Sequence, residues 1–439
     1  MHFIEEGTRF SYFIQALYIQ VAADGKVLYS VFKLMKVKID FKNLFSRIKG
    51  SFKGKPSSLA SLKQVGRYSP IVTRILSDAM LFNEIPSPTE KEELRIEFIL
   101  RKFSEFGIYE PYQDELGNVA AIFPACRPAD KYVLLFTDIG TEKYSPVDSL
   151  VRLTENRAEG LGIADESLGV AALLNLAEWI QKESVAYQMN VICLFTNLSE
   201  ENGEFKALEH FIHFYEGQIA FALYIGSLNQ GNLESKPLGH YKLAVRVSTP
   251  EQEVMSVLGG TSSVTVLSNI AFQLGNIQWD RESDTVLNIA RIDAGIGFGY
   301  YPNEGVLELE MYSGNPPVLD MMKNTITATI QKIASETRVD VEIRVLSYIP
   351  VGNPELNTSL LVTLKDVYSR LKIPIRSVSL PDKTAFLNSF QIPAATLGIS
   401  LGKKSRKEEY VEIAPIEAGF KQLQLFLDLS IEAEELKEK

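Results

Sequence analysis

The 439-residue sequence contains few cysteines, few histidines and no long apolar run. Its two cysteines, Cys126 and Cys193, are too few for the disulfide framework of a small secreted domain or for a cysteine-rich zinc site, and they suit a reducing compartment. Because no stretch of about 18 apolar residues is present, a membrane-spanning helix is not expected. We therefore predict a cytoplasmic protein.

Positive charge is also in the minority, with 45 Lys and Arg residues against 55 Asp and Glu residues and a net charge of −10. A chain with this balance repels polyanions, so nucleic-acid binding is not expected. A composition of 46% hydrophobic and 23% charged residues is that of a globular protein and excludes a disordered, collagen-like or coiled-coil chain.

Residues 1–65 form a basic N-terminal extension that differs from the rest of the chain. Between positions 33 and 55 there are eight basic residues and one acid. Apolar side chains in this segment recur at the spacing of one helix face, at Phe41, Leu44, Phe45, Ile48 and Phe52. Such a helix either makes weak contact with a membrane surface, binds a partner, or packs on the acidic surface of its own protein.

From residue 69 onward, strands alternate with helices; among them are an apolar helix at 167–182, a buried strand at 189–196 and a short strand at 376–380. This alternation predicts an α/β domain with a mixed sheet covered by helices on both faces. Between residues 240 and 348 the predicted order of elements changes to β-α-β-β-α-β, as in a ferredoxin-like unit. We therefore predict an α/β domain made of residues 66–239 and 349–439, with a ferredoxin-like α+β domain of residues 240–348 inserted into it.

Four carboxylates stand next to buried elements of the expected α/β domain. Asp138 follows one buried strand, and the consecutive residues Glu200 and Glu201 follow another. Asp165 directly precedes an apolar helix. Loops beyond the carboxyl ends of the strands build the ligand site in open α/β sheets, so these acids are expected to converge. One carboxylate of such a Glu-Glu pair suits a metal, while its neighbour takes a proton from metal-bound water.

A series of motifs extends over most of the chain. It comprises EIPSPT (84–89), DELGNV (114–119), GIADESLGVA (162–171), FTNLSEENG (195–203), a hairpin within 285–311 and EYVEI (409–413). In order and spacing this series resembles the zinc-dependent aminoacylase and glutamate carboxypeptidase family of metallopeptidases, whose relatives include succinyl-diaminopimelate desuccinylase, carnosinase and peptidase T. The resemblance implies a zinc-exopeptidase-like α/β sandwich with an inserted ferredoxin-like lid domain.

The resemblance also implies roles for the four acids. Asp165 corresponds to the carboxylate that bridges two zinc ions, Glu201 to a terminal metal ligand, Glu200 to the catalytic general base and Asp138 to the acid that orients a histidine ligand. The implied cofactor is zinc or another divalent metal, and the implied substrate is a peptide or an acylated amino acid. If the protein is a dimer, the resemblance implies that the lid domain forms the interface of the homodimer.

Several of the family's metal ligands are absent from this sequence. Phe136 stands at the first histidine, and Lys404 stands at the closing histidine, or Ser405 if the loop is aligned one residue later. No Asp or Glu lies between Gly217 and Leu233, where an acidic ligand is expected. Two of five ligands remain, and two carboxylates are too few for a tight dinuclear site.

Three functional hypotheses follow. The first is a family member that keeps the fold but has impaired or lost zinc-dependent amide hydrolysis. The second is an active dipeptidase or N-acyl amino-acid deacylase with a rearranged metal site; His210 and His213 are spaced for a metal-binding helix face, but they are interpreted as surface or partly packed residues. The third is a membrane-surface or partner-binding protein that acts through residues 33–55.

Lys404 has a specific expected role under the first hypothesis. Without metal, four carboxylates in one cleft would repel one another, so a basic side chain, a bound cation or protonation must compensate. The loop that contains Lys404 is rich in Lys and Arg. We therefore predict that Lys404 or a neighbouring basic side chain replaces the metal charge with an ion pair, the alternative being that the whole loop is solvated.

Overall fold

The structure is a computed structural model, and it describes residues 68–85, 92–140, 150–185, 187–197, 205–249, 261–279, 284–298, 301–380, 383–405 and 408–431. The basic extension 1–65 lies outside the described residues, so the predictions for its segment 33–55 remain predictions. Glu200 and Glu201 also lie outside them.

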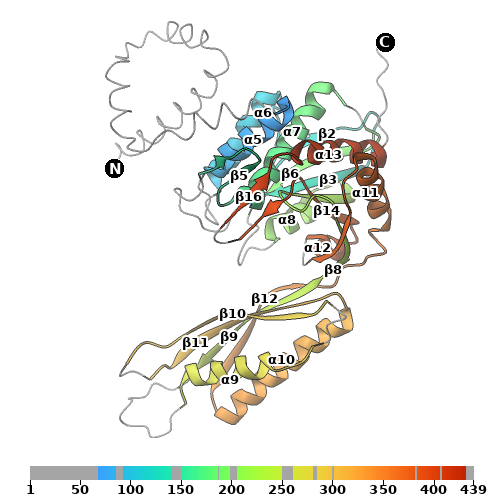
Figure 1. The fold of residues 1–439 in the computed structure, drawn as a ribbon. Helices are drawn as coiled ribbons and strands as arrows, with labels where there is room; N and C mark the ends of the chain where they lie inside the picture. The colour runs from blue at the N-terminus through green and yellow to red at the C-terminus, as the bar shows by residue number, and fades with distance from the viewer. Residues whose placement is uncertain are drawn as a thin grey trace, which may run out of the picture. The chain divides into compact units, whose positions relative to one another are not determined.

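A six-stranded mixed sheet forms the centre of the α/β part, in the order β1-β2-β6-β3-β7-β14 (Figure 1). Strands β6, β3, β7 and β14 are parallel, whereas β2 runs antiparallel to β6 and β1 antiparallel to β2. The six strands are β1 (Tyr112–Gln113), β2 (Val119–Phe123), β3 (Lys131–Asp138), β6 (Asn190–Thr196), β7 (Gln218–Gly226) and β14 (Ala394–Gly398). The predicted mixed sheet is therefore confirmed.

Helices cover both faces of this sheet, as its unbroken apolar strands require. Adjacent residues of β3 show the two layers, because Leu135 belongs to one hydrophobic core and Phe136 to the other. The first layer contains α5 (Pro70–Asn83), α6 (Glu93–Phe106), α7 (Leu168–Glu183), α11 (Thr358–Leu371) and α13 (Ile416–Ile431). The second contains α8 (Lys206–Phe214) and α12 (Lys383–Ser389).

The first turn of α7 lies against the carboxyl end of β7. A Cβ atom on Gly169 would stand 2.6 Å from the backbone oxygen of Ile225, so only glycine permits this approach. A five-residue π-helix, Ile163–Ser167, leads into α7 and begins after Gly162, whose φ of 91° lies in the left-handed region. The backbone that carries Asp165 is therefore held close to the end of the central sheet.

Two smaller sheets complete the α/β part. One has the order β15-β16-β5-β4 and consists of antiparallel pairs. Its strands are β4 (Arg152–Leu153), β5 (Arg157–Glu159), β15 (Gly402–Lys403) and β16 (Tyr410–Glu412). In the other, β8 (Asn232–Pro237) pairs in parallel with β13 (Arg376–Leu380). Of these strands, only β13 is expected from the sequence.

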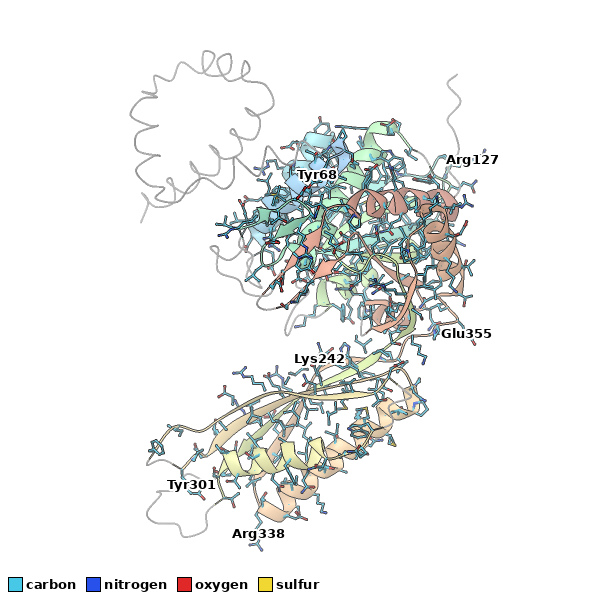
Figure 2. The ribbon with its side chains drawn as sticks, viewed as in Figure 1. Tyr68, Arg127, Lys242, Tyr301, Arg338 and Glu355 are labelled. Atoms are coloured by element: carbon cyan, nitrogen blue, oxygen red, sulfur yellow. The ribbon has the colours of Figure 1, made fainter. Side chains whose placement is uncertain are left out.

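An α+β unit occupies residues 239–349 of the chain. Its sheet has the order β10-β11-β9-β12 with antiparallel neighbours, which is the ferredoxin-like arrangement. Its elements are β9 (Gly239–Ser248), α9 (Ser263–Gly275), β10 (Val286–Ala294), β11 (Glu304–Ser313), α10 (Pro316–Thr337) and β12 (Asp340–Ile349). Val245, Leu309 and Ile326 belong to a separate hydrophobic core of this unit, and Figure 2 shows Lys242 on the sheet face away from both helices.

The chain enters and leaves this α+β unit at neighbouring points. The backbone N–H of Gly352, just after β12, donates to the backbone oxygen of Pro237, just before β9, at 3.1 Å. The unit is thus an insertion whose two ends meet. Among the described residues, no helix combines the length and the apolar character needed to cross a membrane.

Candidate functional site

Asp138 is the last residue of β3, and its buried carboxylate contacts a lysine. Oδ1 accepts a hydrogen bond from the Thr196 hydroxyl at 2.6 Å, and Oδ2 lies 2.6 Å from Nζ of Lys383. Lys383 is the first residue of α12, and its side chain is 17% exposed. This aspartate was expected from the sequence, whereas the lysine that neutralises it was not.

Asp165 lies in the π-helix that precedes α7, and its carboxylate contacts a second lysine. Its Oδ1 forms an ion pair with the ammonium group of Lys404. The Asp165 side chain is 3% exposed, whereas that of Lys404 is 44% exposed. The second oxygen, Oδ2, is buried without a hydrogen-bond partner among the described residues.

The small sheet explains why two residues so distant in sequence meet. Strand β16 pairs with both β15 and β5, with Val411 opposite Gly402 on one side and opposite Ala158 on the other. Lys404 directly follows β15, and Asp165 lies shortly after β5. The strand pairing in this sheet therefore places the ammonium group of Lys404 next to the π-helix that contains Asp165.

Glu166, next to Asp165, is a third buried acid in this cluster. The hydroxyl of Tyr224 donates to its Oε2 at 2.8 Å, and Nζ of Lys383 lies 3.9 Å from the centroid of the Tyr224 ring. Burial first, and then the negative charges of Asp165 and Asp138, raise the pKa of Glu166 well above its usual range, although both lysines oppose the shift. The protonated form of Glu166 is therefore stabilised relative to that of an exposed glutamate.

A cavity of about 270 Å³ opens beside these groups. Asp165 and Lys404 line it together, and the apolar side chains of Leu228, Val378 and Leu380 line it as well. Small ligands are commonly bound in cavities that combine apolar walls with a few placed polar groups. The site is thus a small cavity where buried acids and two ammonium groups meet.

The described residues do not fit a dinuclear metal centre. Among them, no group of three or more His, Cys, Asp or Glu side chains could hold a metal ion. The two acids that could contribute, Asp138 and Asp165, each contact an ammonium group. His210 lies elsewhere, with Nε2 3.9 Å from Glu115 and its ring 4.5 Å from that of Phe214.

The structure therefore brings together three of the residues singled out from the sequence: Asp138, Asp165 and Lys404. The roles proposed for Glu200 and Glu201 remain predictions, because both lie outside the described part of the chain. Three further members of the cluster were not expected from the sequence: Glu166, Tyr224 and Lys383. A usable signal was present for Lys383, since it follows the end of a predicted strand at 376–380 in the same way as the acids follow theirs.

Comparison with solved structures shows the same architecture. A tripeptidase from Staphylococcus aureus superposes with a TM-score of 0.67 at 15% identity, over 82% of this chain and 98% of that chain. An aminopeptidase, PepT, from Bacillus cereus gives 0.63 at 13% identity, over 81% and 98%. A dinuclear metal binding peptidase of the M20 family from Bacillus subtilis gives 0.57 at 13% identity, over 84% and 100%.

No protein-family model matches the sequence, and no curated protein matches it either. The structural likeness extends over four fifths of this chain and nearly the whole length of each of the three relatives. The chain therefore has the fold of the M20 peptidases, the metallopeptidases that its motifs resemble.

Proposed function

We propose that this chain is an M20-fold protein whose pocket works without metal, and that zinc-dependent amide hydrolysis is impaired or lost. The observation that carries the proposal is the ion pair between Lys404 and Asp165. By the resemblance, Asp165 corresponds to the family's metal-bridging carboxylate, and Lys404, or Ser405 if the loop is aligned one residue later, stands at the family's closing histidine ligand. An ammonium group therefore takes the place of both a ligand and the metal charge.

The second lysine supports the same conclusion. Lys383 neutralises Asp138 in the way that Lys404 neutralises Asp165. A divalent cation held by these two acids would lie next to two ammonium groups. Two like unit charges 4 Å apart repel each other by about 4 kcal/mol at the effective dielectric of a protein surface, and a divalent ion doubles this cost.

The neighbours named above are peptidases, so hydrolysis of peptides or acylated amino acids is the activity to test against. The full chain should be incubated with excess zinc, manganese or cobalt, desalted, and analysed for metal by mass spectrometry. The same sample should be assayed with dipeptides, tripeptides and N-acyl amino acids. We expect substoichiometric metal and no turnover. One or two metal ions per chain together with turnover would overturn the proposal and establish an active hydrolase.

A further inference from the structure

One buried carboxylate oxygen in the cavity lacks a hydrogen-bond partner. Asp165 lines the cavity, and its side chain is 3% exposed. Its Oδ1 pairs with Lys404, whereas its Oδ2 has no hydrogen-bond partner in the part of the chain that the structure describes. A buried acceptor without a partner costs stability, and the cost is larger for a charged group. A ligand group that donates a hydrogen bond to this oxygen removes that cost.

Charges of both signs surround the same space. The charged side chains that line the cavity are Asp165, Glu166, Glu234, Lys383 and Lys404. A negatively charged ligand would meet the three acids, and a positively charged ligand would meet the two ammonium groups. Each ammonium group already contacts a buried acid, so the lining leaves little net attraction for a ligand of either sign. The lining therefore favours a neutral ligand that donates hydrogen bonds.

The uncharged part of the lining describes the rest of this ligand. Most of the lining side chains are polar, and the uncharged ones include Ser227, Asn229 and Asn232. A hydroxyl group both donates and accepts hydrogen bonds, so a ligand with several hydroxyls can meet carboxylates and amides alike without carrying charge. Leu228 and Leu380 supply apolar surface on which C–H groups can pack.

We propose that the cavity binds a neutral monosaccharide, one hydroxyl of which donates to Oδ2 of Asp165. A volume of about 270 Å³ is at the small end of ligand cavities and suits one sugar ring rather than an oligosaccharide. The ring has hydroxyls along its edge for the polar lining and C–H groups on its faces for the apolar lining. This inference rests on the proposed function, because a metal ion bound by Asp165 would occupy the same oxygen.

Titration calorimetry on the full chain in chelator-treated buffer, with the sugar in large excess, tests this inference. The probes are D-glucose, D-galactose and D-mannose. Each is compared with its 2-amino-2-deoxy derivative, which carries an ammonium group, and with its uronate, which carries a carboxylate. We expect at least one neutral hexose to bind with a Kd of about 1 mM or lower, and both of its charged analogues to bind at least about tenfold more weakly.

The variant D165N tests the unpartnered oxygen. The amide oxygen stays with the Lys404 donor, because an amide nitrogen does not accept from an ammonium group, so a donor replaces the acceptor at the position of Oδ2. We expect a loss of at least about tenfold in affinity. D366N is the matched control, because Asp366 pairs with Arg370 in an exposed position outside the cavity, and its affinity should not change.

A second variant keeps the test independent of the Asp165 ion pair. Val378 lines the cavity and is only partly buried, so V378F should fold and fill space that the sugar needs. We again expect a loss of at least about tenfold in affinity. Denaturation curves show whether each variant is folded, and V378F decides the result if D165N is not.

The inference is overturned if none of the three hexoses binds, if the charged analogues bind as tightly as the neutral sugar, or if a folded D165N or V378F keeps full affinity. Zinc content after the metal loading described above separates the two proposals. Metal-free protein that binds no hexose refutes only this inference, whereas stoichiometric zinc refutes the proposed function.

Discussion

Lys404 and Asp165 form an ion pair although 239 positions separate them in sequence. Backbone pairing between β15, β16 and β5 brings their segments together, so the contact is part of the fold rather than a chance meeting of two surface side chains. Because the lysine is partially exposed and the aspartate is buried, we expect the ion pair to stabilise the fold by an amount between those of a surface pair and a buried pair.

Replacing Lys404 by alanine should lower the free energy of unfolding by roughly 1–3 kcal/mol, between the values typical of exposed and buried pairs. The cause is the loss of the partner of a buried carboxylate. Chemical denaturation at pH 7 in zinc-free buffer measures the change. Lys403→Ala is the matched control and should cost about 0–1 kcal/mol, because both members of the Lys403–Glu408 pair are exposed. Equal effects of the two substitutions would contradict a structural role for the Lys404 pair.

Replacing Lys383 by methionine should be more damaging, because its side chain is 17% exposed and that of Asp138 is 6% exposed. We expect a loss of about 3 kcal/mol for the single variant, which leaves a buried charge without its cation. The double variant D138N/K383M should recover a large part of that loss. A double-mutant cycle from denaturation curves measures the coupling. Additive single effects would show that the pair contributes no coupling energy.

Replacing Lys404 by histidine should create zinc affinity that the natural chain lacks. The substitution removes one ammonium group and places an imidazole next to Asp165, and imidazole and carboxylate are both ligands that zinc accepts. We expect zinc affinity, measured by competition with a chromogenic chelator, to rise at least about tenfold over the natural chain. Lys403→His adds the same ligand one residue away and should leave the affinity unchanged. A rise in both variants would point to adventitious surface binding.

Lys102 and Asp78 link stability to alkaline pH. Burial lowers the pKa of Lys102, but attraction to Asp78 and a hydrogen bond with it, aided by Glu105, outweigh burial and raise the pKa above 10.5. A raised pKa in the folded state means that stabilisation is complete below the unfolded pKa and is lost as the pH rises through the folded pKa.

The difference in unfolding free energy between the natural chain and Lys102→Met should therefore stay constant from neutral pH to about pH 10 and shrink at higher pH. Denaturation curves at a series of pH values measure it. A difference that grows above pH 10 would have the wrong sign and would contradict the assignment.

The α+β unit presents the face expected to mediate a homodimer. Strand β10 is one of the two edge strands of its sheet and exposes Val286 and Ile292. Helix α9 exposes Phe272, which is 68% accessible. Edge strands and exposed apolar side chains favour pairing with a second copy. We expect a dimer by light scattering and a monomer after the substitutions Phe272→Lys and Ile292→Lys. A dimer that survives both substitutions would place the interface elsewhere.

The periodic elements of the fold were predictable from the sequence, and the irregular ones were not. Strand β13 was expected at the bounds it has, and α7 and β6 within one residue of theirs, because long apolar patterns define buried helices and strands. Strands β15 and β16 contain two and three residues, which is too short for any period to emerge. Their pairing depends on long-range register, which a local pattern does not contain.

The residues of the candidate site also divide into those that the sequence predicts and those that it does not. Asp138 and Asp165 were identified because carboxyl ends of strands meet at one edge of a sheet, and a basic partner for them was expected because buried acids must be neutralised. Lys383 was missed because it begins a seven-residue helix, too short to be recognised from its periodicity. Glu166 and Tyr224 come together only through packing of the π-helix against β7, which the sequence does not express locally.

The hydrogen bond from Gly352 to Pro237 also bears on how this protein unfolds. The α+β unit is inserted at one point of the chain and has its own hydrophobic core. Such a unit can unfold without unfolding the rest of the molecule. The free energies expected above then belong to whichever cooperative block contains the altered residue. Lys383, Lys404 and Lys102 lie in one block and Phe272 in the other, so a calorimetric trace with two transitions would assign each substitution to its own transition.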